Sequence, residues 1–221
     1  MSHSDNEEKL QEIQEFLGKT WKIMVAIIII GLLAFWGWRY WKSHNVEKAM
    51  VASSQYEQLI AKLSNDDPTS IDGLVKFADQ NDTVYSVFAD LKAAQLYVEN
   101  KKDYSGAEQL LIAASKKTDS EPVLAIINIR IARLQYQLGK YEDSLKSLDK
   151  VTNSNWASIV NNIRGDALAK MEKYSLACNA YEVALASQPT PEQEKELKMK
   201  LNKAQYLAAK QSQEQQKSVK N

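Results

Sequence analysis

The chain lacks most of the residue types that disulfide, metal and nucleic-acid-binding sites require. Its 221 residues include one cysteine and two histidines, so an intramolecular disulfide and a Cys/His zinc cluster are both excluded. The 28 basic and 28 acidic side chains balance, so there is none of the basic excess that nucleic-acid-binding domains carry. With only 4 prolines and 44% apolar residues, the chain is neither collagen-like nor wholly disordered, and it can bury a core.

One long apolar run stands near the N-terminus. Residues 23–38 read IMVAIIIIGLLAFWGW and contain no charged side chain. A helix of this length covers roughly 24 Å of a hydrocarbon core that is about 30 Å thick, so flanking residues must supply the remainder. We therefore predict a transmembrane helix over residues 21–42. Aromatic and basic residues that favour the membrane interface occupy its ends: Trp21, Lys22, Trp36, Trp38, Arg39, Tyr40 and Trp41.

The residues around this run suggest an anchor that stays attached, but they leave its orientation open. No small-x-small cleavage pattern follows the run, so we expect an uncleaved anchor and not a signal peptide. The positively charged residues that set orientation are equally many on both sides. They are Lys9, Lys19 and Lys22 before the run, and Arg39, Lys42 and Lys48 after it.

Residues 1–20 form a short tail with two open interpretations. Leu10, Ile13, Phe16 and Leu17 recur at helical spacing before Gly18, which is typical of a short amphipathic helix at a membrane surface. An acidic, mostly solvated tail that carries a few apolar side chains explains the same residues.

After the anchor, residues 43–209 show helical periodicity and no run of strand type. Leu124, Ile127, Ile131, Leu134 and Leu138, for example, recur every three or four residues. The last predicted helix covers residues 191–209, and residues 190–193 read TPEQ, which matches a capping box. Residues 210–221 are rich in Gln, Lys and Ser, and we expect them to be frayed or disordered. The fold class predicted for the chain is all-α.

A three-residue motif that ends in tyrosine occurs three times in this region. Its three copies are residues 102–104 (KDY), 139–141 (GKY) and 172–174 (EKY), each followed by small and apolar residues at fixed offsets. The tyrosines are 37 and 33 residues apart, close to the 34-residue period of tetratricopeptide repeats. We therefore predict a solenoid of tetratricopeptide-like helix pairs, with a plain helical bundle as the alternative.

The small residues of these units agree with the repeat pattern, with one irregularity. Gly165 and Ala132 occupy positions at which a small side chain lets two helices approach closely, and Gly139 occupies a turn. The first unit has an extra residue between Tyr97 and Tyr104, and no unit has the usual early tryptophan.

No residue pattern indicates catalysis. His3 lies in the N-terminal tail, His44 lies just after the anchor, and Cys178 lies on the apolar face of a predicted helix, where a buried thiol is unreactive. The sequence contains no glycine-rich phosphate loop and no GxSxG or HExxH motif. We expect no catalytic residue, no cofactor and no metal ligand.

A solenoid offers instead the surface formed by the first helix of each pair. The residues predicted to face a partner there are Ile129, Arg133, Tyr136, Asn162 and Asp166. Each of them is equally compatible with an ordinary packing or solvated position. The surface as a whole is the hypothesis.

Two stretches, GWRYWKSHNVEKA at residues 37–49 and INIRIARLQYQLGKYEDSLKSLD at residues 127–149, resemble the YfgM family of bacterial inner-membrane proteins. The resemblance extends from the anchor to about residue 205, and it implies an ancillary subunit of the SecYEG translocon with its repeat domain in the periplasm. It also implies association with SecYEG and with the membrane-anchored periplasmic chaperone PpiD. The implied task is to help unfolded, newly exported proteins away from the translocon.

Three functional hypotheses follow. The first is a non-enzymatic, membrane-anchored chaperone or scaffold beside the translocon, in contact with lipid and protein but not with nucleic acid. The second is a membrane-tethered adaptor that recruits one dedicated partner and faces the cytoplasm. The third is an enzyme whose site carries no recognised motif.

Overall fold

The computed structural model describes the backbone of residues 4–63 and 69–219, and every regular element within those ranges is helical. The chain divides into two compact units, Met1–Val51 and Ala52–Asn221. The all-α fold class predicted from the sequence is therefore confirmed.

The first unit is formed by one helix. Helix α1 (Ser4–Ala61) runs through it without a break, so residues 1–20 and 21–42 do not form separate elements where the structure describes them. Within Trp21–Ala61, the most apolar window of 18 residues has a mean hydropathy of 2.0, and none of its residues is buried. An apolar helix of this length with no protein against it is suited to lipid, and it is the predicted transmembrane helix. The side chains of Leu10, Ile13, Phe16 and Leu17 lie outside the described residues.

The predicted interface residues of α1 are exposed along the helix. Trp36 and Tyr40 are 74% and 77% exposed, and Trp21, Trp38 and Trp41 are also exposed. The Lys42 ammonium lies 5.4 Å from the centroid of the Trp38 ring, within the range of a cation–π contact. Their role at the membrane interface remains a prediction.

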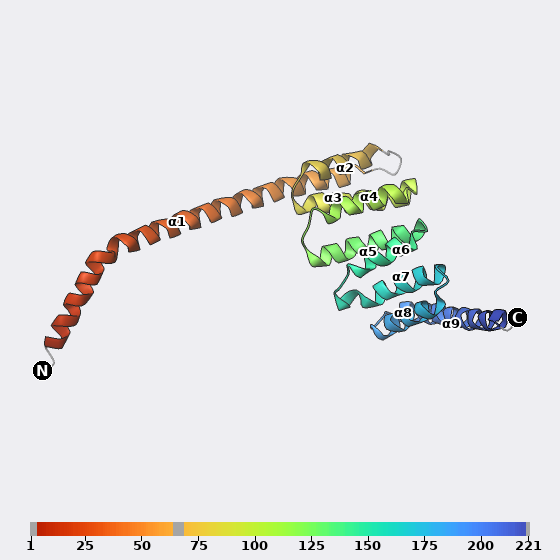
Figure 1. Ribbon diagram of the computed structural model, residues 1–221. Helices are drawn as coiled ribbons and strands as arrows, with labels where there is room; N and C mark the ends of the chain where they lie inside the picture. The colour runs from red at the N-terminus through yellow and green to blue at the C-terminus, as the bar shows by residue number, and fades with distance from the viewer. Residues whose placement is uncertain (1–3, 64–68, 220–221) are drawn as a thin grey trace. The chain divides into compact units, whose positions relative to one another are not determined.

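The second unit contains residues 52–61 of α1 and a stack of helix pairs (Figure 1). The helices α3 with α4, α5 with α6, and α7 with α8 form three antiparallel pairs, and α9 follows the last pair. This arrangement confirms the predicted solenoid. The elements are α2 (Thr69–Gln80), α3 (Val84–Leu96), the π-helical turn η1 (Tyr97–Lys101), α4 (Tyr104–Ser115), α5 (Glu121–Gln137), α6 (Tyr141–Asp149), the 3₁₀ turn η2 (Ser154–Trp156), α7 (Ala157–Lys170), α8 (Tyr174–Ala186) and α9 (Pro191–Val219).

The repeated three-residue motif that ends in tyrosine forms the turn inside each helix pair. Helices α4, α6 and α8 all begin at its tyrosine. Two residues earlier, Lys102, Gly139 and Glu172 have φ angles of 53°, 75° and 58°. A residue in this left-handed region ends the first helix and reverses the chain. Only Gly139 adopts it without steric cost.

Small residues set the distance between paired helices, as the sequence predicts. Ala132 and Ala177 are fully buried, and Ser144 donates a hydrogen bond of 2.8 Å to the Ala132 carbonyl. A Cβ atom added to Gly165 would collide with the ring of Tyr181, and that ring is only 3% exposed. The absence of a side chain at Gly165 is therefore what allows α7 and α8 to pack this closely.

The π-helical turn η1 explains why the first repeat, formed by α3 and α4, is irregular. The π-helical turn at Tyr97–Lys101 directly follows α3, and a π turn accommodates one residue more than an α-helical turn does. The extra residue that the sequence shows before Tyr104 is thus taken up within the helix. The turn to α4 keeps the same form as in the other units.

Helix α9 is longer than predicted. The sequence predicts a helix that ends at residue 209 and a frayed or disordered tail after it, whereas α9 continues to Val219. Residues 192–219 contain neither Gly nor Pro and are rich in Gln, Lys and Ala, which are strong helix formers. The predicted capping box at its start is confirmed, because the Thr190 amide donates to Gln193 Oε1 at 3.0 Å and the Gln193 amide to Thr190 Oγ1 at 3.3 Å.

Candidate interaction groove

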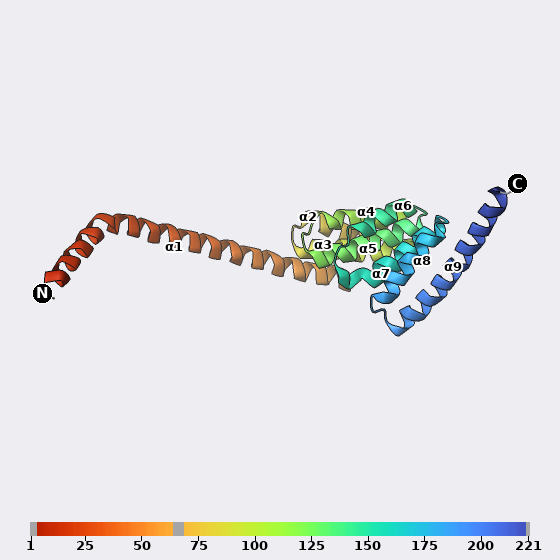
Figure 2. The ribbon, with the colours of Figure 1, turned by 60° about the horizontal axis from the view of Figure 1, so that its bottom comes forward.

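Two pockets lie on either side of α5. Helices α3, α4 and α5 with η1 line the first, and α5, α7, α8 and α9 line the second (the helices are labelled in Figure 2). We name them by the helices that bound them. The α3–α5 pocket is lined by Leu91, Ala94, Gln95, Val98, Glu99, Leu111, Arg130, Arg133 and Leu134. The α5–α9 pocket is lined by Tyr136, Asp166, Ala169, Lys170, Tyr174, Tyr181, Lys200, Lys203, Ala204 and Leu207. Four of the five predicted contact residues line these pockets or lie beside them.

The exception is Ile129, for which the prediction of a partner-facing position is wrong. Its side chain is 5% exposed and packs in a cluster with Leu148 of α6 and with Val160 and Ile163 of α7. The α7 side chains pack over this part of α5, so the position that the repeat pattern assigned to a partner is occupied by the chain itself.

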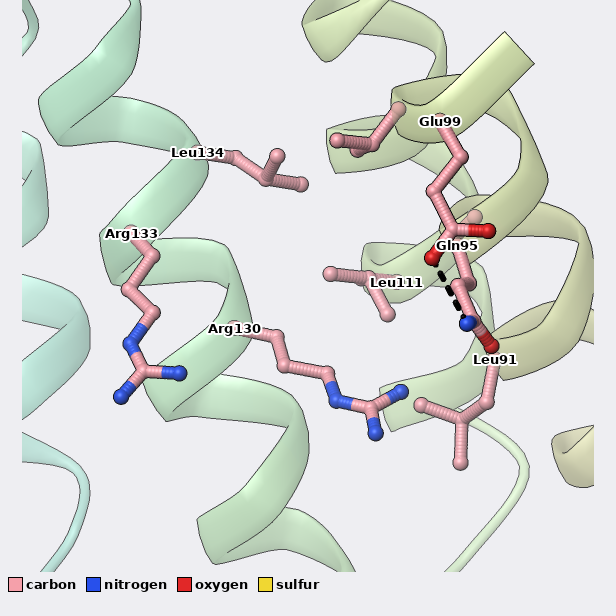
Figure 3. A pocket seen from close by; sticks show the side chains of 9 residues that line it. Leu91, Gln95, Glu99, Leu111, Arg130, Arg133 and Leu134 are labelled. Atoms are coloured by element: carbon pink, nitrogen blue, oxygen red, sulfur yellow. Dashed lines mark hydrogen bonds between the residues drawn. The ribbon is translucent and has the colours of Figure 1, made fainter.

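The α3–α5 pocket has an apolar floor and a charged rim (Figure 3). Its volume is about 250 Å³, and Leu111 and Leu134 at its base are 2% and 8% exposed. On one side, Gln95 donates a hydrogen bond of 2.8 Å to Glu99. On the other side, Arg130 and Arg133 extend from α5 and are exposed. Among the described residues, neither guanidinium has a hydrogen-bond or ion-pair partner.

The α5–α9 pocket is organised in the opposite way, because its charged groups bind one another. Lys200 of α9 donates to Asn162 Oδ1 and to Asp166 Oδ2, both at 2.8 Å. Lys200 also pairs with Glu196 at 2.8 Å. The Tyr181 hydroxyl donates to the second oxygen of Asp166 at 2.8 Å. The two predicted contact residues of α7 are therefore held by α9.

The environment of this cluster changes the proton affinity of its members. Burial raises the pKa of Tyr181, and the neighbouring Asp166 carboxylate raises it further. Burial lowers the pKa of Lys200, but its hydrogen bonds to Asp166 and Glu196 outweigh that effect, so the pKa is raised. Both shifts favour the protonated, hydrogen-bonded form of the cluster.

Other polar side chains join neighbouring helices inside the stack. Glu108 of α4 accepts hydrogen bonds from Gln135 at 2.8 Å and from Lys140 at 2.9 Å. Asp90 of α3 pairs with Lys117 at 2.7 Å, although burial raises the pKa of its carboxyl group. These contacts pair buried groups between helices, although Asp90 Oδ1 has no hydrogen-bond partner among the described residues. None of these side chains lines either of the two pockets, so we assign the contacts to the stability of the stack.

The environment of the Cys178 thiol disfavours its reactive form. Cys178 is half-buried, and burial raises the pKa of its thiol, which disfavours the reactive thiolate. Within residues whose side chains the structure describes, no group of three or more His, Cys, Asp and Glu residues could hold a metal ion.

Two features of the groove were not found from the sequence. Lys200 lies 34 residues from Asp166, in a helix expected only to cap the stack, and no local pattern joins the two. Arg130 lies one turn from Arg133 in the same helix, and the helical period alone could have added it to the predicted surface.

Comparison with known proteins shows the family to which the chain belongs. Residues 14–206 match the model of the tetratricopeptide repeat-like domain. The ancillary SecYEG translocon subunit of Escherichia coli is 33% identical over 200 residues, which cover 90% of this chain and 97% of that protein. The subunit of the same name from Haemophilus influenzae is 31% identical, with the same coverage.

A solved structure supports the fold alone. The double mutant of MamA from strain RS-1 has a TM-score of 0.50 and 15% sequence identity, and the match covers 74% of this chain and 96% of that one. The anchor, the repeat turns and the match over nearly the whole length of the relatives together identify the chain as a member of the tetratricopeptide repeat-like family of ancillary SecYEG translocon subunits.

Proposed function

We propose that this protein is a non-enzymatic, membrane-anchored subunit that works beside the SecYEG translocon and handles newly exported proteins. The observation that carries the proposal is the 33% identity to a subunit of that name along 97% of its length. The transmembrane helix α1 and the stack of repeats supply the two parts that such a subunit needs, which are an anchor and an interaction surface.

The repeat unit, in this proposal, faces the periplasm and meets two kinds of partner. One is the translocon together with the chaperone PpiD, and the other is the unfolded chain that leaves the translocon. Anchoring confines the groove to the membrane, so weak contacts suffice because partners are met at a high effective concentration.

Orientation is tested by labelling intact cells. A full-length variant with Cys178→Ser and Gln213→Cys has a single thiol at an exposed position of α9. After the outer membrane is permeabilised, a membrane-impermeant maleimide should label this thiol. Protection until the inner membrane is broken would place the repeats in the cytoplasm and support the adaptor hypothesis.

Association is tested by crosslinking from the groove. A photoreactive residue is placed at Glu99, which is exposed on the rim of the α3–α5 pocket. We expect adducts with SecYEG or PpiD and with many exported polypeptides. One dominant adduct would indicate a dedicated partner and no client handling, and the absence of translocon adducts and of co-purification with SecYEG would contradict the proposal.

A further inference from the structure

The α3–α5 pocket carries a polar feature that the fold does not use. Arg130 and Arg133 are exposed on one helix face, one turn apart, and neither guanidinium has a partner among the described residues. By contrast, Arg164, which is the one other arginine in residues 52–221, pairs with Asp149 at 2.7 Å. A guanidinium presents a rigid set of donors that matches a carboxylate, so two unpaired ones at a rim favour an acidic ligand.

The interior of the same pocket favours an apolar group. Most of its surface is apolar and lies between the first helices of two successive repeats. The apolar lining residues are Leu91, Ala94, Val98, Leu111 and Leu134. The volume of about 250 Å³ is below the range of about 300–1,000 Å³ that is typical of drug-sized ligands. Its size therefore matches one or two side chains.

The irregular turn η1 helps to form the rim. Val98 and Glu99, both within the π-helical turn Tyr97–Lys101, line the pocket opposite α5. Glu99 also makes the rim asymmetric, since its acidic side belongs to α3 and η1 while the basic side belongs to α5 (Figure 3).

We propose that the α3–α5 pocket binds an aliphatic side chain flanked by aspartate or glutamate, in an extended segment of another protein. The aliphatic side chain enters between Leu91 and Leu134, above Leu111. The neighbouring carboxylate lies on the α5 side and accepts hydrogen bonds from Arg130 and Arg133, away from Glu99. This inference rests on the proposed function, in which the groove binds other proteins, and it specifies the sequence chemistry that one pocket selects.

The test uses the full chain in nanodiscs of zwitterionic lipid and a fluorescent peptide, Gly-Ser-Asp-Leu-Asp-Ser-Gly, blocked at both ends. Anisotropy should report saturable binding that weakens with added salt. Replacing both peptide aspartates by asparagine should weaken binding by about tenfold or more, because charge-assisted hydrogen bonds are lost. The double variant Arg130→Gln with Arg133→Gln should lose a similar factor, and the asparagine peptide should show little further loss on that variant.

Matched variants separate this site from general charge and from misfolding. Lys116→Gln removes one positive charge at an exposed position outside both pockets and should leave binding unchanged. Gln95→Trp fills the pocket from an exposed position without a change of charge, and it should abolish binding. Hydrogen exchange shows whether the double arginine variant keeps its fold. If that variant loses amide protection in α5, the result for Gln95→Trp decides whether the pocket binds the peptide.

Four results would overturn the inference. Three concern the peptide, and they are no binding by the wild-type chain, equal binding of the aspartate and asparagine peptides, or unchanged binding by the double arginine variant and by Gln95→Trp. Binding of anionic vesicles that requires the same arginines, without peptide binding, would assign the pocket to lipid and would also overturn it. Peptide binding is measured without the translocon, so its failure is distinct from a failure of the proposed function, which appears as lost association with SecYEG.

Discussion

The two pockets beside α5 are built from equivalent helices but use their charges differently. In the α5–α9 pocket, Lys200 and Tyr181 surround Asp166 with hydrogen bonds of 2.8 Å. In the α3–α5 pocket, Arg130 and Arg133 have no partner within the described part of the chain. Charge in the first pocket therefore holds the end of the solenoid together, whereas charge in the second is available to a ligand.

The difference follows from what lies next to each pocket. A repeat stack must cover the open apolar end of its last unit, and α9 does so with Leu197 and Ala204, which are 0% and 2% exposed. Lys200 lies on the same helix and pairs with the carboxylate of α7 as a result of that docking. No terminal helix covers the α3–α5 pocket, so its rim keeps unpaired charge.

The largest expected effect is on the docking of α9. Leu197→Ala removes a fully buried side chain and should destabilise the end of the stack by about 2–5 kcal/mol. Hydrogen exchange of the full chain in detergent should show α9 losing protection before α3 and α5. Met199→Ala, on the same helix but 61% exposed, is the control and should change stability by less than about 0.5 kcal/mol. Equal effects of the two variants would show that α9 does not cap the stack.

A smaller effect compares the charges of the two pockets directly. Asp166→Ala leaves the Tyr181 hydroxyl without its acceptor and removes one partner of Lys200, which should cost about 1–3 kcal/mol. Arg133→Gln should cost less than about 0.5 kcal/mol, because its side chain is exposed and its guanidinium has no polar partner among the described residues. The measurement is the change in exchange protection of α7 and α9. A larger loss for Arg133→Gln than for Asp166→Ala would reverse the comparison.

The smallest effect is a pH dependence confined to the α5–α9 pocket. The pKa of Lys200 is raised in the folded protein, so folding holds its proton more tightly than the unfolded chain does. The resulting stabilisation is complete below the ordinary lysine pKa of about 10.4 and is lost as the pH rises through the raised folded-state pKa. The stability difference between the wild type and Lys200→Met should thus stay constant from neutral pH to about pH 9 and shrink above about pH 10. A difference that grows with alkaline pH would contradict this assignment.

The sequence predicts most of the fold because the fold is set by local signals. Tyr104, Tyr141 and Tyr174 mark the start of the second helix in each pair, and Gly165 marks a close approach that the structure confirms. The period and the turn residues are readable along the chain, since each unit packs mainly against its neighbours.

The groove is less predictable because it depends on contacts between distant segments. Whether Ile129 is buried depends on how far α7 overlaps α5, and whether Asp166 is free depends on where Lys200 is placed. The sequence also shows the extra residue of the first unit. It does not show that a π-helical turn absorbs this residue and places Glu99 on a pocket rim.

Crosslinking in living cells from the two pockets tests the difference between them most directly. A photoreactive residue is placed at Glu99, which is exposed on the rim of the α3–α5 pocket, or at Lys203, which is exposed in the α5–α9 pocket. Adducts with other proteins should form from Glu99 and disappear when Arg130 and Arg133 are both changed to Gln, while Lys203 yields few. Adducts that form mainly from Lys203, or that persist at Glu99 without the two arginines, would contradict the assignment of ligand binding to the α3–α5 pocket.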